Sequence, residues 1–189
     1  MSELIRIVFV SIVFLVLRHF VRERNYYEER SEMLLLNVLP KEISDILRDE
    51  PRTIATQHAA TTILFADVVG FTKLSATVQP LELVTVLDEV FLEFDALADR
   101  YGVEKIKTIG DCYMVAAGVP RERPDHATAL VGMALDMREL VASRTFAGHR
   151  LAFRIGLNSG PVVAGVIGRR KFIYDLWGDA VNLASRMES

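Results

Sequence analysis

Two aspartates stand at positions in the sequence where carboxylates can bind metal ions. Asp67 directly follows a short apolar run at 62–66, which has the pattern of a buried strand. Asp111 lies in a Gly-Asp turn between two further strand-like runs, at 103–109 and 112–117, which together predict a hairpin. Paired carboxylates suit Mg²⁺ or Mn²⁺, and two such ions stabilise a displacement at phosphorus. Aspartate is also an ordinary turn residue, so the spacing alone leaves both interpretations open.

The elements around these aspartates must bring them together across a long stretch of sequence. A helix predicted at 80–101 separates the first strand from the hairpin, and a second helix is predicted at 127–141. Further strands are predicted at 151–157, 162–166 and 172–177, before a C-terminal helix. This β-α-β-β-α-β order predicts an α+β fold of the ferredoxin-like, split βαβ type. The first two strands then run parallel, so Asp67 and Asp111 are expected at the same edge of the sheet.

Polar groups elsewhere in the sequence could bind phosphate. After Gly70, the backbone N–H groups of Phe71 and Thr72 can face an anion. In the C-terminal helix, Asn182 and Arg186 lie four residues apart and so share a face. The opposite, apolar face consists of Ala180, Leu183, Ala184 and Met187. An arginine at this place can neutralise phosphate charge in a transition state, although a solvated surface would show the same pattern.

Two lysines of the second predicted strand are a further candidate. Lys105 and Lys107 alternate along the strand and are therefore expected on one face of it. A lysine there is commonly a solvated residue at a sheet edge. The glycines at 160–168 do not match the P-loop pattern, so a P-loop nucleotide site is not expected.

The N-terminal region differs in character from the rest. Residues 7–17 carry no charge, and the basic residues Arg18, Arg22 and Arg24 follow. Eleven residues are too few to cross a bilayer, but the basic flank is typical of the cytoplasmic end of a membrane helix. We therefore expect the end of a transmembrane helix at 1–21; a buried or interfacial helix is the alternative.

Composition excludes some classes of function. The formal net charge is −3, from 22 basic and 25 acidic residues, so no overall positive field attracts nucleic acid. The single cysteine, Cys112, excludes an internal disulfide and fits a reducing compartment.

Four stretches of the sequence closely resemble class III adenylate cyclases. They are FADVVGFT (65–72), VEKIKTIGDCYM (103–114), FRIGLNSGPVVAGVIG (153–168) and YDLWGDAVNLASRMES (174–189). The resemblance covers about 36–189, and the preceding segment resembles the linker of membrane-anchored bacterial cyclases with a single catalytic domain. It implies that ATP is converted to 3′,5′-cyclic AMP and pyrophosphate by two-metal-ion catalysis, in intracellular signalling.

The resemblance also implies a role for each matching residue. Asp67, Asp111 and the Val68 carbonyl would bind two ions, Mg²⁺ or Mn²⁺, in each active site. Lys107 and Asp175 would read adenine, because guanylate cyclases typically carry Glu and Cys at these places.

The remaining implied roles concern the ribose, the phosphates and a second subunit. Asn182 would orient the ribose, and Arg186 would meet the phosphate charge as the 3′-hydroxyl attacks. In such cyclases each site takes its metal aspartates from one subunit and its adenine and transition-state residues from the other. A homodimer would therefore hold two complete sites.

The predicted organisation is the end of a transmembrane helix at 1–21, a helical signalling linker at 22–60 and a catalytic domain at 61–189. The catalytic domain is expected on the cytoplasmic side of the cell membrane. Members of the family continue for several strands beyond the position of Ser189. The resemblance therefore predicts a chain truncated at both ends, with a C-terminally incomplete catalytic domain and weak or absent activity.

Two alternative functions stay open. One is a guanylate cyclase, and the other is a catalytically inactive dimerisation or regulatory module. Degenerate modules are expected to have lost Asp67, Asp111 or Arg186, and all three are present here. A diguanylate cyclase shares the split βαβ plan, but its GG-[DE]-E-F loop is missing from this sequence.

Overall fold

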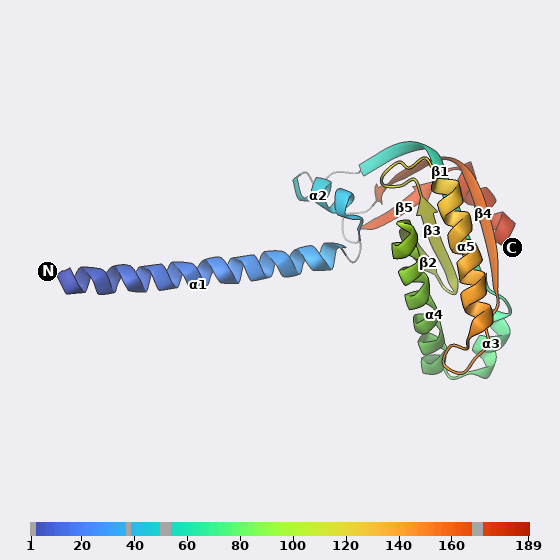
Figure 1. The fold of residues 1–189 in the computed structure, drawn as a ribbon, viewed down its shortest axis with the longest axis horizontal. Helices are drawn as coiled ribbons and strands as arrows, with labels where there is room; N and C mark the ends of the chain where they lie inside the picture. Colours follow the sequence, from blue (N-terminus) through green and yellow to red (C-terminus); the bar gives the residue numbers. More distant parts are fainter. Residues whose placement is uncertain (1–2, 37–38, 50–53, 168–171) are drawn as a thin grey trace.

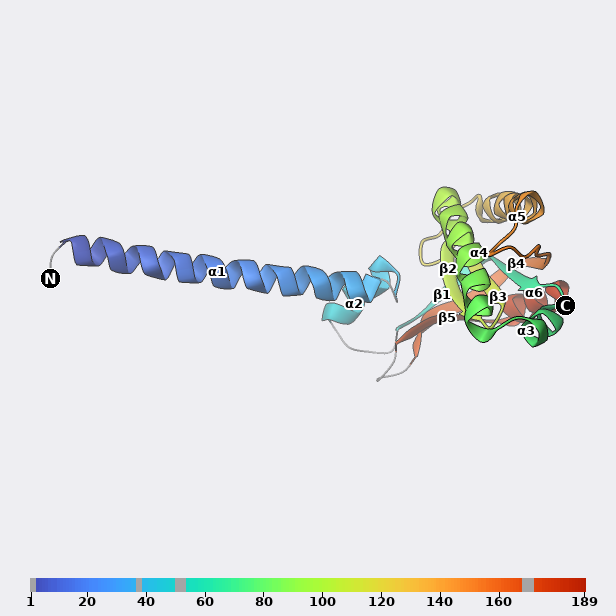
Figure 2. The same ribbon diagram turned by 90° about the horizontal axis from the view of Figure 1, so that it is seen from below.

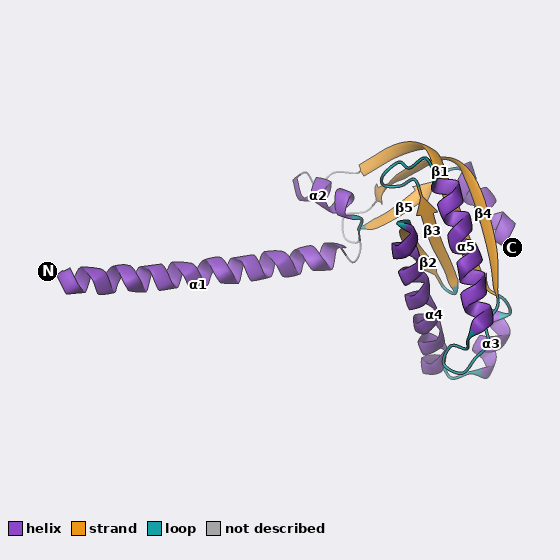
Figure 3. Cartoon of the chain, in the orientation of Figure 1, coloured by secondary structure: helices purple, strands orange, loops and turns teal. Residues whose placement is uncertain are grey.

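The computed structural model describes residues 3–36, 39–49, 54–167 and 172–189. Figure 1 shows a globular α+β body with one long helix extending away from it, and Figure 3 distinguishes the helices from the strands. The helices are α1 (Glu3–Leu36), α2 (Lys41–Asp49), α3 (Phe71–Thr77), α4 (Pro80–Tyr101), α5 (His126–Ser143) and α6 (Asp179–Glu188). The strands are β1 (Ile54–Val68), β2 (Glu104–Ile109), β3 (Cys112–Ala117), β4 (Phe153–Ile167) and β5 (Ile173–Trp177).

The long helix α1 has 34 residues and a length of about 50 Å at 1.5 Å per residue. It continues without a break past residue 21, where the sequence predicted the end of a membrane helix. Apolar side chains along it, such as Phe9, Phe14 and Phe20, are exposed. Within the described ranges, no helix combines the length and the apolar content that a membrane crossing needs. The structure therefore does not support the predicted membrane helix.

The five strands form one sheet in the order β2-β3-β1-β4-β5, and every neighbouring pair is antiparallel. Because β3 runs opposite to both β1 and β2, these two strands are parallel to each other. Helix α4 connects them, as the split βαβ plan requires. The predicted α+β fold class is confirmed.

Helices cover both faces of this sheet. Helices α4 and α5 pack on one face, where Leu64, Phe94 and Met133 are fully buried. Helix α6 packs on the other face, where Ile63 and Ala184 are buried in a second apolar cluster. Figure 2 shows α6 and the pair α4 and α5 on opposite sides of the strands. Two separate clusters of buried apolar side chains therefore hold the sheet between its helices.

Strands β1 and β4 are much longer than the sequence predicted. We expected a linker as far as residue 60 and two short strands at 151–157 and 162–166. In the structure β1 and β4 each have 15 residues and pair along their length, with a register shift in β1 between His58 and Thr61. Pro161 lies opposite this shift and has no N–H to donate, which explains why the pairing is irregular there but does not end.

Other boundaries were predicted well. Helix α4 begins at Pro80 and ends at Tyr101, and Gly102 follows with a φ of +60°, in the left-handed region that favours glycine at a helix end. The short helix α3 was missed, because the sequence indicated only a turn around Gly70. Gly70 has a φ of +73° and stands directly before that helix.

Candidate active site

Topology brings the two predicted metal-binding aspartates together. Asp67 is the second-last residue of β1, and Asp111 lies in the turn between β2 and β3. Burial raises the pKa of the Asp111 carboxyl, and the neighbouring Asp67 carboxylate raises it further. Hydrogen bonds from the backbone N–H of Asp111 itself and, to a smaller extent, of Val68 oppose this rise in the pKa. The two acids and the Val68 backbone therefore meet at one edge of the sheet, as the strand directions predicted.

This carboxylate pair fits a divalent cation. Burial and the repulsion from Asp67 disfavour the charged form of Asp111. A positive ion between the two carboxylates would stabilise the negative charge on both. Among the described residues, no group of three or more His, Cys, Asp or Glu side chains is arranged to hold a metal ion. A cation here would therefore take two carboxylates and complete its shell with backbone oxygen, water or phosphate oxygens, as Mg²⁺ commonly does.

An arginine that the sequence analysis did not single out lies at the same edge. Arg154 of β4 is paired in register with Asp67, and its guanidinium donates to the Asp67 carboxylate at 2.7 Å. It also donates to the Glu188 carboxylate, at the end of α6, at 3.0 Å. Its side chain is about half exposed. Arg154 lies in the FRIG sequence at 153–156, which the sequence analysis noted for its resemblance alone. Only the register of β1 against β4 shows that this arginine faces Asp67.

The residues after β1 stand in the first turn of α3. Phe71 is half-buried and Thr72 is exposed. The first intrahelical hydrogen bonds begin at Lys73 and Leu74, whose N–H groups donate to the Gly70 carbonyl. Phe71 and Thr72 come before these residues in the helix. Their N–H groups have no acceptor within the helix and can therefore bind another partner. Their predicted contact with phosphate stays a prediction.

Lys107 and Asp175 form a direct ion pair. The Lys107 Nζ donates to Asp175 Oδ2 at 2.5 Å, and Asp175 Oδ1 accepts from the Leu176 N–H at 2.9 Å. The lysine is on β2 and the aspartate is on β5, the two outer strands of the sheet. The sheet must therefore curl strongly for these side chains to meet, and strand order alone would not predict the contact.

The expectation that Lys105 and Lys107 share a face was wrong. A register shift between them in the β2–β3 pairing places Lys105 opposite Val115 and Lys107 opposite Met114. Val115 and Met114 belong to the clusters on opposite faces of the sheet. Lys105 accordingly reaches Asp95 on α4, at 2.7 Å, and not Asp175. A β-bulge adds one residue and so reverses the alternation of side chains.

Helix α6 presents the last two predicted residues to solvent. Asn182 and Arg186 are exposed, and their side chains contact no polar partner among the described residues. Only part of the predicted apolar face is buried: Ala180 and Ala184 pack on the sheet, whereas Leu183 and Met187 are 46% and 63% exposed. The backbone of α6 lies so close to β4 that a Cβ on Gly156 would meet it, and Ala180 and Ala184 supply the small buried side chains of this contact.

Comparisons with known proteins agree with this geometry. The adenylate and guanylate cyclase catalytic domain family matches residues 54–189. The chain belongs to this cyclase family. It is 48% identical over 185 residues to an adenylate cyclase of Mycobacterium tuberculosis, covering 95% of this chain and 42% of that protein. The cyclase chain thus spans less than half the length of this relative.

Solved cyclase structures share the fold. The catalytic core of a rhodopsin-guanylyl cyclase with converted specificity, in complex with ATPαS, has a TM-score of 0.70 and 44% identity, over 72% of this chain and 75% of that one. A non-canonical dimeric guanylyl cyclase domain from the fungus Blastocladiella emersonii has a TM-score of 0.68 and 42% identity, over 72% of this chain and 77% of that one. Relatives of both substrate classes therefore match this cyclase, and family membership alone does not decide between ATP and GTP.

Proposed function

We propose that the protein is an adenylate cyclase that converts ATP to 3′,5′-cyclic AMP and pyrophosphate. The observation that carries the choice of ATP is the ion pair of Lys107 and Asp175, at 2.5 Å. Adenine offers an acceptor at N1 and a donor at its amine, which a lysine and an aspartate complement. Guanine offers a donor at N1 and an acceptor at O6, which reverses the pattern. The pair must open to admit the base, and the base then replaces the contact that the two side chains make with each other.

The carboxylate edge supplies the second half of the proposed site. Asp67 and Asp111 would hold Mg²⁺ or Mn²⁺, which neutralises the charge on the phosphates. Arg154 already lies at 2.7 Å from Asp67, so its guanidinium is placed to bind a phosphate oxygen once a cation takes over the aspartate. The N–H groups of Phe71 and Thr72 would bind further phosphate oxygens at the same edge.

The reaction joins the ribose 3′-oxygen to the α-phosphorus. As that bond forms, the bond from the α-phosphorus to the oxygen of pyrophosphate breaks and the 3′-hydroxyl loses its proton. Asn182 would orient the ribose, and Arg186 would stabilise the charge that develops on the phosphate oxygens. Both side chains are exposed, and neither makes a polar contact with another described residue. Both are therefore available to bind the nucleotide.

We also propose that the active enzyme is a homodimer. Leu183 and Met187 are large, apolar and exposed on α6, the helix that carries Asn182 and Arg186. A second subunit that covers these side chains would bring Arg186 against the partner's nucleotide. A guanylyl cyclase domain of Blastocladiella emersonii forms a dimer that is described as non-canonical, so it supports self-association of the fold and not this particular arrangement.

Complementation between two inactive variants tests the shared site. In a version of the protein with a complete catalytic domain, Asp111→Ala and Arg186→Ala each remove one half of the proposed site, so each variant alone should make little cyclic AMP from ATP and Mn²⁺. Mixing the two should restore activity, because a mixed dimer keeps one complete site. Recovery of activity supports both the reaction and the dimer. A wild-type protein that makes cyclic GMP in preference to cyclic AMP would reject the substrate assignment and favour a guanylate cyclase.

Attachment to the cell membrane is a separate proposal, with the catalytic domain on the cytoplasmic side. It is supported by the uncharged run at 7–17 and the arginines that follow it. Fractionation of cells that express the protein with and without residues 1–21 tests it. Equal amounts in the soluble fraction would reject the anchor.

A further inference from the structure

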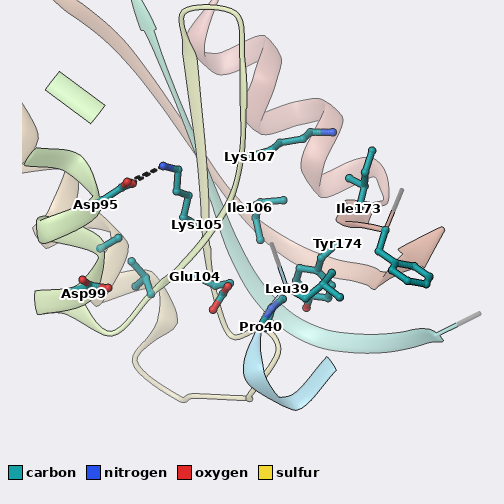
Figure 4. Close-up of a pocket in the computed structure, with 13 residues that line it drawn as sticks. Leu39, Pro40, Asp95, Asp99, Glu104, Lys105, Ile106, Lys107, Ile173 and Tyr174 are labelled. Carbon is teal, nitrogen blue, oxygen red and sulfur yellow. Dashed lines mark hydrogen bonds and ion pairs between the residues drawn. The ribbon is translucent and has the colours of Figure 1, made fainter. Parts of the chain in front are cut away.

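Two lysines on β2, separated by one residue, point to opposite sides of the sheet. Lys105 extends toward α4 and Lys107 extends away from it, as Figure 4 shows. The cause is the register shift between them, which leaves Ile106 as the extra residue of a bulge. In a regular strand the two side chains would share one face. The bulge therefore decides that a single lysine reaches Asp175 on β5.

The strand itself holds this bulge weakly. Strand β2 is an edge strand that pairs with β3 alone in the described sheet, so its other edge has no ladder to fix the register. The two-residue turn at 110–111 fixes the register of 107–109 against 112–114, but a shift of the bulge along β2 would exchange the faces of the residues beyond it. Because Lys105 and Lys107 are chemically identical, their side chains do not by themselves distinguish one register from the other. An interaction outside the strand can make that choice.

Asp95 of α4 provides such an interaction. Its carboxylate accepts a hydrogen bond from Lys105 Nζ at 2.7 Å and another from the Tyr113 hydroxyl at 2.6 Å. Tyr113 is fully buried on β3, and Lys105 Nζ lies 5.2 Å from the centre of its ring. Helix α4, strand β2 and strand β3 are thus connected at one point, beside the bulge. A carboxylate fixed by a buried tyrosine can hold only the lysine on its own side of the sheet.

We propose that Asp95 is a positioning residue for base selection, which fixes Lys105 on the α4 side and so leaves Lys107 to pair with Asp175. The inference rests on the proposed function, because it assigns Lys107 and Asp175 to the purine. In this proposal Asp95 acts through its contact with Lys105 and does not itself bind the base or the phosphates. Its loss should loosen the bulge and let Lys107 leave its partner, so that discrimination between ATP and GTP declines more than turnover does.

The variant Asp95→Asn removes the charge and keeps the shape. We expect the ratio of kcat/KM for ATP to that for GTP to decrease about tenfold, since the charge-assisted contact that selects the register is weakened. Most of this change should come from a higher KM for ATP. Lys105→Gln removes the same ion pair but leaves the contact between Asp95 and Tyr113, so it should reproduce the lower selectivity if Asp95→Asn folds poorly.

A closely matched control is available on the neighbouring helix. Asp136 of α5 also accepts from a basic residue and a tyrosine, namely Arg100 and the Tyr101 hydroxyl, the latter at 2.8 Å. It contacts neither β2 nor β5 through these bonds. Asp136→Asn should therefore lower stability by a comparable amount and leave the ATP-to-GTP ratio unchanged. An equal decrease of the ATP-to-GTP ratio in Asp95→Asn and in the control Asp136→Asn would overturn the proposal. So would an unchanged ratio in Asp95→Asn and Lys105→Gln proteins that fold normally.

Nucleotide binding separates this inference from the proposed function. Dissociation constants for nonhydrolysable analogues of ATP and GTP report base selection without turnover. A version of the protein with a complete catalytic domain that prefers the ATP analogue but makes no cyclic nucleotide rejects the cyclase activity, and the Asp95 variants can still be compared. A wild-type protein that makes cyclic AMP, with Asp95→Asn retaining full preference for the ATP analogue, rejects the role of Asp95 alone.

Discussion

The carboxylate edge and the lysine–aspartate pair are assembled in different ways. Asp67 and Asp111 meet because β1 ends where the hairpin of β2 and β3 turns, and the direction of the strands is enough to bring them together. Lys107 and Asp175 lie on opposite outer strands, and they meet only because the sheet curls and a bulge turns the lysine. A slip of one residue in β2 would turn Lys107 to the other face of the sheet and separate the second pair. Changes that affect one region and spare the other test this difference.

The largest effect is expected at the carboxylate edge. Asp111→Ala should reduce cyclic AMP formation by about a thousandfold or more, because it removes half of the proposed cation site. Binding of the ATP analogue should retain its preference over the GTP analogue, since Lys107 and Asp175 are untouched. Steady-state assays with Mn²⁺ and analogue titrations measure the two quantities. Asp125→Ala, a change to an exposed aspartate paired with Arg123, is the control and should retain activity.

A second test addresses α6, which connects the two regions. The helix begins directly after β5 and ends at Glu188, whose carboxylate binds Arg154. A Cβ on Gly156 would lie 2.3 Å from the backbone nitrogen of Glu188, so the helix must move to admit it. Gly156→Ala should therefore reduce the free energy of unfolding by about 3 kcal/mol and lower activity.

The matched control for this change is Gly148→Ala. Gly148 has a φ of +84° but open space where its Cβ would be, so only the left-handed conformation is penalised, by about 1 kcal/mol. Urea unfolding of both variants compares a steric conflict with a conformational one. Equal losses would mean that α6 adapts easily and does not couple the regions.

The lysine–aspartate pair can be reversed on its own. Lys107→Glu combined with Asp175→Cys should shift the preference from ATP toward GTP by about tenfold, because the new groups complement guanine and no longer adenine. The dependence on Mn²⁺ should not change, since the carboxylate edge is intact. Competition between ATP and GTP in one assay measures the shift. An unchanged preference would contradict the assignment of these residues to the base.

The smallest effect concerns pH and the strand that carries Lys107. Burial raises the pKa of the Glu104 carboxyl on β2 from 4.5 to about 7, and the nearby Glu42 and Asp99 carboxylates add to this. The folded protein therefore holds this proton more tightly than the unfolded chain does. Stability from this group is complete below about pH 4.5 and is lost as the pH rises to about 7.

Glu104→Gln should remove this part of the pH dependence and stabilise the protein at pH 8 relative to the wild type. Urea unfolding at pH 5 and pH 8 measures the difference. Glu139→Gln, on the exposed surface of α5, is the control and should leave the slope with pH unchanged. A wild-type slope retained in Glu104→Gln would assign the pH dependence to another group.

Local sequence patterns were sufficient for much of the fold and for one half of the candidate site. The period of apolar residues predicted helix α4. Its two ends were predicted correctly because Pro80 and Gly102 act on the backbone locally. The chain order of strands and helices predicted the split βαβ plan. That plan, through the direction of its strands, predicted that Asp67 and Asp111 would meet.

Tertiary structure decided the rest, because it depends on pairing between distant segments. The length of β1 and β4 and the irregularity opposite Pro161 follow from each strand having the other as a partner. The approach of Arg154 to Asp67 is a matter of register, and the separation of Lys105 from Lys107 is a matter of one bulged residue. Leu183 and Met187 have the spacing of a buried face but are exposed, whereas Ala180 and Ala184 of the same helix are buried against the sheet. A sequence records which residues alternate, whereas packing between segments fixes which side of the sheet each one finally occupies.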